Sequence, residues 1–413
     1  MAYLKDKSIL SLLLIIIISA YFVVSKDNSC SKQVAATESI EVKHVSFSEE
    51  DLEWFNKQLT NILLDSDFNG NVFVSRNGQS IFDRSFGFSD FRSFEPLSKE
   101  TVFQLASITK TFTGAAILLL QEDSLLCIDE KVVEYIPEFP YNNITIKHLL
   151  THTAGLQNYM FILERFWNKG HHPNNQDVLQ MFIEQNRPLN FNPGSKFEYS
   201  NTAYVFLALI IESVSEMSYS EYLEERIFKP LGLEYTFVFD IDKHSEIENR
   251  AFGFRRARNS WRLVPADVID AIKGDKGIFS NIIDLQKWDE AFYSETLLPK
   301  ETIEKAFEFK VLDNDSIIEY GYGWRLQEVF GVKAVHHPGR WRGFRTSFKR
   351  FPEKNSTLII LSNNDSDIAH LVDTVQSLMF REERALWLEE QMKKLEAIAF
   401  DSIPIIPKTD SIP

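Results

Sequence analysis

The sequence predicts an α/β fold in which one β-sheet is assembled from both ends of the chain, with a helical lobe inserted between its two parts. Helical periodicity followed by two alternating apolar runs occupies residues 47–90, and strand-like runs return only between about 250 and 362. The region between them, to about residue 235, has the spacing of helices and loops. The chain of 413 residues is 44% hydrophobic and 13% aromatic, which is enough apolar material for a large core.

The N-terminal segment predicts export or membrane attachment. Lys5 and Lys7 precede the uncharged run SILSLLLIIIISAYFVV, and positive residues before such a run are typical of an export signal or a single membrane anchor. Cys30, in the polar tether that follows, is a candidate for lipid modification, although the Asp and Asn before it fit that signal poorly. We therefore expect residues 1–46 to be a signal or anchor with a tether, and the rest of the chain to lie outside the cytoplasm, attached to the membrane.

Residues 47–380 are expected to form the globular domain. The stretch FSEEDLEWFNKQLTNILLDS has apolar residues at helical spacing, and GNVFVSRNGQSIFDRSFGFSD reads as a hairpin turning at Asn77-Gly78. Residues 381–413 are expected to be a C-terminal helix followed by a proline-rich, disordered tail. Later strands are expected in RAFGFRR, SWRLVP, YGYGWRLQ, FGVKAVHHPG, GFRTSFKRFP and STLIILSNN.

Charge and composition exclude several classes of partner. The net charge is −15 and no basic stripe is present, so we expect no nucleic acid to bind. Two cysteines, Cys30 and Cys127, are too few for a disulfide framework. The pair His171-His172 suggests a metal site, but no acidic or thiol partner lies close to it in the sequence, so a surface loop is favoured. We expect neither a metal nor an organic cofactor.

The stretch LASITK places Ser107 one helical turn before Lys110, at the point where the strand-like VFQLA gives way to a helix. A serine hydroxyl becomes a nucleophile when a neighbour takes its proton, and a desolvated lysine can be that neighbour. The alternative is an ordinary N-cap serine followed by an exposed lysine. On its own the motif does not separate the two.

Two further motifs follow in the order known for Ser-x-x-Lys hydrolases. Tyr199 and Asn201 form a Tyr-x-Asn in a loop that enters a helix, whereas the earlier YNN at Tyr141 lies in a turn-rich linker and its tyrosine is expected to pack. His337 and Gly339 supply the third motif, a basic residue, any residue and glycine on a strand. Three motifs in order favour the nucleophile with its base.

With these motifs, residues 50–365 resemble the serine β-lactamases and penicillin-binding-protein-like hydrolases, in particular the branch of class C β-lactamases, D-alanyl-D-alanine carboxypeptidases, D-aminopeptidases and esterases. The markers LLTHTAGL, PGSKFEYSN, GDKGIFSN and GYGW support the resemblance. It implies an antiparallel sheet flanked by helices, with an inserted helical lobe. It also implies hydrolysis of an amide or ester through an acyl-serine, on a small molecule or a peptide, including a cell-wall peptide.

The resemblance implies a role for each motif residue. Ser107 would be acylated, Lys110 would help to remove its proton, and Tyr199 would share acid and base work with a pKa lowered by cations. Asn201 would orient Lys110 or the substrate carbonyl. The backbone N–H groups of Ser107 and Arg340 would form the oxyanion hole, and the strand of His337 and Gly339 would line the cleft. His152 in THTAG is expected to be a packed loop histidine.

One position departs from the β-lactamase pattern. Histidine stands at 337, where β-lactamases of this kind carry lysine, and histidine is mostly neutral near pH 7. This weakens the β-lactamase interpretation and favours a peptidase or an esterase acting on uncharged groups. Two alternatives stay open: a true class C-like β-lactamase, and a non-catalytic binding or sensor protein on the same fold.

Overall fold

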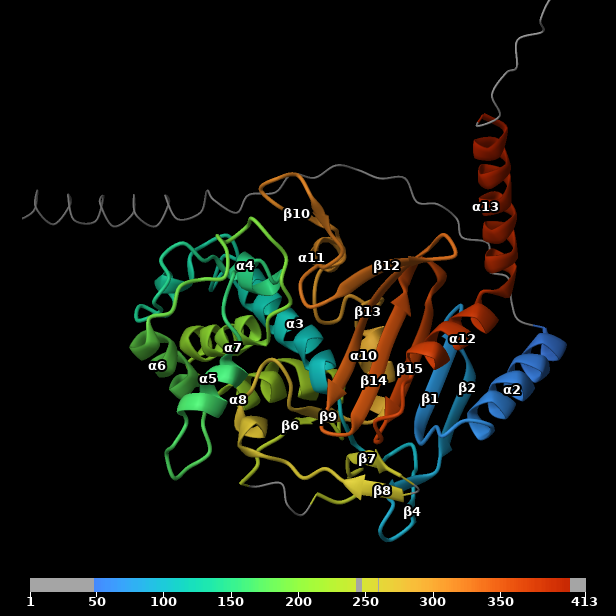
Figure 1. Ribbon diagram of the computed structural model, residues 1–413, viewed down its shortest axis with the longest axis horizontal. Coiled ribbons are helices and arrows are strands. Elements are labelled where there is room, and N and C mark those ends of the chain that lie inside the picture. Colours follow the sequence, from blue (N-terminus) through green and yellow to red (C-terminus); the bar gives the residue numbers. More distant parts are fainter. Residues whose placement is uncertain (1–47, 243–246, 259, 402–413) are drawn as a thin grey trace, which may run out of the picture. The chain divides into compact units, whose positions relative to one another are not determined.

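The computed structural model describes residues 48–242, 247–258 and 260–401 (Figure 1). Its centre is an antiparallel sheet with the strand order β12-β13-β14-β15-β1-β2. Strand β1 pairs with β15, so the two ends of the chain meet in one sheet, which confirms the predicted architecture. The strands are β1 (Gly70–Arg76), β2 (Gln79–Phe86), β12 (Arg325–Val329), β13 (Val332–Trp341), β14 (Phe344–Phe351) and β15 (Ser356–Ser362).

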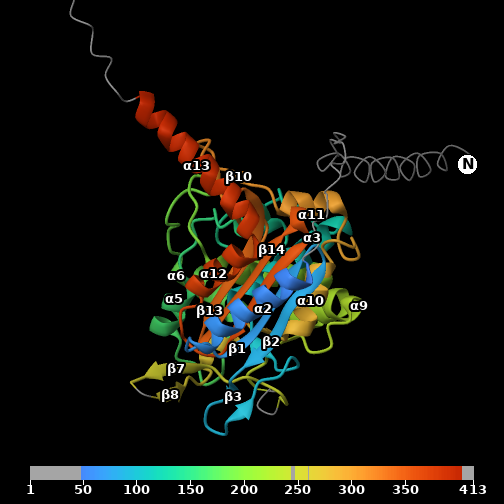
Figure 2. The same ribbon diagram turned by 90° about the vertical axis from the view of Figure 1, so that its right-hand side faces the viewer.

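Helices cover both faces of this sheet. On β1, Val72 packs into a cluster with α2 (Glu49–Leu64) and α12 (Ala369–Met379), which lie in front of the sheet in Figure 2. The next residue, Phe73, points to the other face and joins the larger core shared with α10 (Ile282–Glu290). Because successive side chains of a strand point to opposite faces, a strand with every position buried needs a helical layer on each side.

A helical lobe stands beside the sheet, as predicted (Figure 1). Its central helix, α3, is buried along almost its whole length, and α7 packs against it. The predicted YNN tyrosine, Tyr141, packs on Phe139 as expected. The helices of the lobe are α3 (Thr109–Glu122), α4 (Ile146–Leu150), α5 (Tyr159–Phe166), α6 (Asn175–Gln185), α7 (Asn201–Ser215), α8 (Tyr219–Leu223) and α9 (Lys229–Leu231).

A three-stranded sheet that we did not predict joins the lobe to the main sheet. Strand β9 (Ile278–Ser280) lies between β5 (Phe103–Gln104) and β6 (Phe237–Val238). Strand β5 lies within the strand-like run VFQLA, whereas β6 and β9 are two and three residues long, too short for a period-2 pattern to reveal them. This sheet ties the segment before Ser107 to the segment after Asp275.

One predicted strand run is shorter than expected, and two others pair outside the main sheet. In YGYGWRLQ the strand begins only at Arg325, because Gly323 turns the chain with φ 88° and approaches α3 so closely that a Cβ would lie 2.6 Å from the Lys110 carbonyl oxygen. The runs RAFGFRR and SWRLVP form a separate hairpin of β7 (Phe254–Ala257) and β8 (Ser260–Leu263). The remaining elements are β3 (Phe88–Asp90), β4 (Glu95–Pro96), α11 (Lys300–Ala306), β10 (Lys310–Val311) and β11 (Ile317–Ile318).

The predictions for the two ends of the chain fall only partly within the described residues. Helix α13 (Arg381–Asp401) follows α12. None of the helices in the described residues is long and apolar enough to cross a membrane. The apolar run at 8–24, Cys30 and the proline-rich tail from residue 402 lie outside the described residues, so these predictions stay as they were.

Candidate active site

Ser107 lies in a short 3-10 helix, η1 (Ala106–Ile108), between β5 and α3. The preceding residue, Ala106, holds a left-handed backbone conformation with φ 51°, which is uncommon for a residue with a side chain and is found at functional sites. The N-cap of α3 is Ile108, without a side-chain capping bond, and Lys110 is fully buried. The alternative of a capping serine with an exposed lysine is therefore wrong.

The Lys110 ammonium is the centre of the site. Its Nζ lies 3.4 Å from Ser107 Oγ, donates to Asn201 Oδ1 at 2.8 Å, and donates to the backbone carbonyl of Asp275 at 2.7 Å. These partners come from η1, from the first residue of α7 and from the loop before β9. The structure thus brings together the Ser-x-x-Lys and Tyr-x-Asn motifs.

The surroundings of Lys110 favour its neutral form. Burial lowers the pKa of Lys110 to about 7, the Asp275 charge opposes this shift, and the positive charge of Arg325 adds to it. A buried ammonium loses its hydration, and a nearby cation makes the charged form still less favourable. A lysine with a pKa near 7 is present in its neutral form in a large fraction at neutral pH, and the neutral amine can accept a proton.

Tyr199 lies beside both cations. Its ring centroid is 5.0 Å from Lys110 Nζ and 5.1 Å from the guanidinium carbon of Arg325. Its hydroxyl is buried without a hydrogen-bond partner among the described residues. Burial raises the pKa of Tyr199, and this effect outweighs the lowering by the positive charge of Arg325. The expectation of a lowered Tyr199 pKa is therefore wrong for the free protein, because desolvation exceeds the attraction of the cations.

His337 is buried beneath the site and is neutral. Burial, Lys110 and Arg325 together place its pKa well below the ordinary value. Its Nδ1 lies 2.8 Å from the carbonyl oxygen of Pro338, which can only accept, so Nδ1 carries the proton. Nε2 then accepts from the Tyr320 hydroxyl at 3.1 Å. Both ring nitrogens of His337 are therefore engaged within the protein, by Pro338 and Tyr320.

Gly339 lets β13 lie against the turn that carries Ser107. A Cβ at this position would stand 2.0 Å from Thr346 Oγ1 and 2.3 Å from the Leu105 carbonyl oxygen. Thr346 Oγ1 donates to that carbonyl at 2.9 Å. The glycine of the third motif therefore fixes the position of the strand relative to η1.

Arg340 and Arg342, which follow Gly339, have different surroundings. The Arg340 side chain is exposed, whereas Arg342 pairs with Asp267 and lies 3.9 Å from Asp270. Neither is placed as a free cation in the site. The predicted oxyanion role of the Arg340 N–H stays a prediction.

His152, which was expected to be a packed loop histidine, and three tryptophans have structural surroundings. His152 is fully buried, accepts from the Ser200 N–H at 3.1 Å and packs on Tyr199. Trp324 is core, while Trp261 and Trp341 are half-buried.

The histidine pair His171-His172 has acidic neighbours that the sequence did not reveal. Asp177 lies 3.6 Å from His171, and Asp242 lies 3.0 Å from His172. The described residues contain no group of three or more potential metal ligands.

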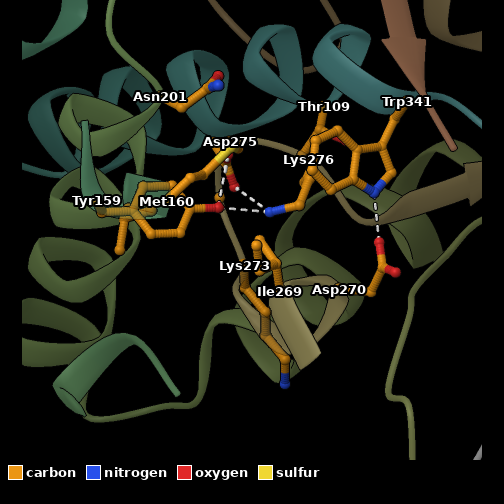
Figure 3. A network of polar contacts seen from close by, with 12 residues as sticks. Thr109, Tyr159, Met160, Asn201, Ile269, Asp270, Lys273, Asp275, Lys276 and Trp341 are labelled. Carbon is orange, nitrogen blue, oxygen red and sulfur yellow. Dashed lines mark hydrogen bonds and ion pairs between the residues drawn. The ribbon is translucent and has the colours of Figure 1, made fainter. Parts of the chain in front are cut away.

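Sequence reasoning missed a buried network of Tyr159, Asp275 and Lys276 (Figure 3). The Asp275 carboxylate accepts from the Tyr159 hydroxyl at 3.1 Å, and Lys276 Nζ donates to the same hydroxyl at 2.5 Å. Asp275 and Lys276 are both almost fully buried. The network holds the backbone carbonyl that binds Lys110. Its only signal in the sequence was GDKG, the start of the marker GDKGIFSN, and its residues had no predicted role.

A cavity of about 470 Å³ opens beside Asn201. Ser200 and Asn201 line it together with residues of the helical lobe, and no strand of the main sheet contributes to it. Asn201, which accepts from Lys110, connects this cavity to the site.

A family model, a curated relative and a solved structure identify the proteins that this chain resembles. The β-lactamase family model matches residues 68–375. Penicillin-binding protein 4* of Bacillus subtilis is 36% identical over 311 residues, which cover 73% of this chain and 69% of the relative. The crystal structure of a penicillin-binding protein from Bacillus halodurans superposes with a TM-score of 0.69 at 27% identity, covering 78% of this chain and 98% of that one.

A more distant structure agrees in fold. FmtA from Staphylococcus aureus has a TM-score of 0.70 at 20% identity and covers 88% of this chain and 94% of its own. At this identity the likeness speaks for the fold alone. With the family match over most of the chain and the arrangement of Ser107 and Lys110, it follows that the chain belongs to the β-lactamase family, which it shares with penicillin-binding-protein-like serine hydrolases.

Proposed function

We propose that this protein hydrolyses an ester or amide through an acyl-Ser107 intermediate. The observation that carries the proposal is the buried Lys110, with a pKa of about 7 and its Nζ 3.4 Å from Ser107 Oγ. The neutral amine takes the hydroxyl proton while Ser107 Oγ attacks the substrate carbonyl. The tetrahedral intermediate collapses as the leaving group takes a proton. A water molecule then attacks the carbonyl of the acyl-Ser107, again losing a proton to the base, and releases the acyl group.

Tyr199 is suited to act first as a proton donor, and not as the base that takes the proton from Ser107. Because burial raises its pKa, its hydroxyl keeps the proton in the free protein. Beside Ser107, this hydroxyl can donate to the leaving group and recover a proton from Lys110. The backbone N–H groups of Ser107 and Arg340 would stabilise the oxyanion.

The third motif favours an esterase or a peptidase over a class C-like β-lactamase. His337 is neutral with both nitrogens bonded, and the Arg340 side chain is exposed. Neither His337 nor the Arg340 side chain therefore supplies a cation for the carboxylate that a β-lactam carries. We expect short-chain nitrophenyl esters and D-amino-acid peptides to be better substrates than a chromogenic cephalosporin.

A fluorophosphonate probe tests the nucleophile. Wild-type protein should be labelled at Ser107, Ser107→Ala should not be labelled, and Ser294→Ala, at an exposed position, should behave like wild type. Labelling of Ser107→Ala at another peptide would refute the proposal. Absence of both labelling and turnover in folded wild type would instead favour the non-catalytic binding protein.

We also propose that the protein acts outside the cytoplasm, attached to the membrane by its N-terminal segment. Support comes from Lys5 and Lys7 ahead of the apolar run at 8–24. Fractionation of cells expressing the full chain should place it with membranes, and a chain lacking residues 1–46 should lose this association. Cell-wall peptides would then be within its reach.

A further inference from the structure

Two arginines converge in the cavity beside Asn201. Arg165, on α5, and Arg187, just after α6, both line it. Their guanidinium carbons lie 5.7 and 5.5 Å from the ring centroid of Phe166. Neither forms an ion pair with a carboxylate of the described residues. Two cations that share one ring repel each other, and an anion bound between them would remove this repulsion.

Arg187 is held in place from two sides. Its Nη1 donates to Gln157 Oε1 at 3.1 Å, and the same Gln157 side chain donates through Nε2 to the Pro188 carbonyl at 2.9 Å. The Tyr141 hydroxyl donates to the Arg187 carbonyl at 2.9 Å. A guanidinium that lies over a ring and is fixed at one edge has other N–H groups that can bind a carboxylate in a bidentate manner.

The one carboxylate in the lining of the cavity is already bound. Glu198 accepts from Asn190 Nδ2 at 2.8 Å and pairs with Lys196 at 3.1 Å, and these contacts hold its pKa below the ordinary value. Its charge is compensated locally by Lys196. The two arginines therefore supply an uncompensated positive charge in the cavity, within a chain whose net charge is −15.

We propose that Arg165 and Arg187 bind a carboxylate on the acyl part of the substrate. This rests on the proposed acyl-serine function and names its substrate class. Asn201, which contacts Lys110, lines the cavity; its other lining residues belong to the helical lobe, and none belongs to β13. The acyl part stays attached to Ser107 after the leaving group departs, so a contact with it positions the substrate in both steps.

Matched esters test the proposal. p-Nitrophenyl valerate and the mono-p-nitrophenyl ester of glutaric acid share a leaving group and differ by the terminal carboxylate. The adipic and suberic monoesters place this carboxylate farther from the ester. Wild type should prefer one of the acids to its neutral counterpart by about tenfold or more in kcat/KM, the usual worth of a charged hydrogen bond. Arg165→Gln and Arg187→Gln should each reduce this preference for the acid over the valerate ester.

The control variant is Arg84→Gln. Arg84 lies on β2, at the far edge of the sheet, where it donates to Thr60. This variant should keep the preference, and circular dichroism should show all three variants folded. A preference that survives in the Arg165→Gln, Arg187→Gln double variant would overturn the proposal, as would valerate hydrolysis equal to that of every acid in wild type.

Binding separates this proposal from the hydrolase function. In Ser107→Ala, calorimetry should show tighter binding of the preferred acid monoester than of the valerate ester, and Arg187→Gln should abolish the difference. Equal binding would refute the arginine site even if wild type turns over both esters. Binding of inorganic phosphate at the two arginines without any ester preference would mean an anion site unconnected with substrate, and would also overturn the proposal.

Discussion

At the scale of single residues, the protonation of Lys110 controls the proposed chemistry. Its pKa of about 7 means that the neutral, proton-accepting form increases as the pH rises through that value. We therefore expect kcat/KM for a neutral nitrophenyl ester to rise with pH, with a midpoint near 7. A pH profile in buffers of constant ionic strength measures this. A rising limb centred below about pH 5 would point to a carboxylate or another group in place of Lys110.

Lys110 and Tyr199 should behave as one unit. Lys110→Ala and Tyr199→Phe should each lower kcat by roughly 10² to 10⁴, the usual worth of a positioned proton transfer. Since both handle the same proton, the double variant should lose little more than the worse single variant. Steady-state kinetics of the four proteins form a double-mutant cycle. Losses that multiply would show that the two residues act independently.

Arg325 is the residue that supplies a cation where the third motif carries a neutral histidine. It lies at the start of β12, its register partner on β13 is His336, and its guanidinium faces the Tyr199 ring. Its charge lowers the pKa of both Lys110 and Tyr199. Arg325→Met should therefore raise the Lys110 pKa, move the acid limb of the pH profile upward and reduce activity at neutral pH.

The matched variant is Arg325→Lys, which keeps the charge. It should retain the position of the acid limb more closely than Arg325→Met does. If Arg325→Met lowers kcat without moving the limb, the arginine acts through packing, and the electrostatic role assigned to it is wrong.

At the scale of elements, the closeness of β13 and η1 depends on Gly339. Gly339→Ala would place a Cβ 2.3 Å from the backbone oxygen of Leu105, so the strand or the Ser107 turn must move. Overpacking of this kind costs about 1–3 kcal/mol. Urea unfolding should show that loss together with reduced probe labelling. Arg340→Ala, the exposed neighbour, should change stability by no more than about 0.5 kcal/mol.

At the scale of the whole molecule, the sheet makes the two ends of the chain depend on each other. Leu59 of α2 is fully buried against strands from both ends. Leu59→Ala should destabilise the protein by about 2–5 kcal/mol, although it is remote from Ser107. Circular dichroism and Ser107 labelling, followed across a urea titration, should lose signal together. Labelling that persists after the sheet has unfolded would show that the lobe folds alone.

The sequence alone determined the order of the elements and the identity of the motif residues. Ser107 and Lys110 are one helical turn apart, so local periodicity was enough to place them on one face. The hairpin at Asn77-Gly78 and the return of strand-like runs after residue 250 predicted a sheet built from both ends. These features depend on contacts between near neighbours or on period-2 and helical patterns, which a sequence displays directly.

Only the tertiary structure decided how the site is charged. Arg325 reaches Tyr199 because β12 and β13 pair in one particular register, and a strand pattern does not state its register. His337 bonds to Tyr320, and the Asp275 carbonyl binds Lys110, through segments far apart in the chain. The raised pKa of Tyr199 has the same origin: burial depends on the atoms packed around a group, and those atoms come from distant parts of the fold.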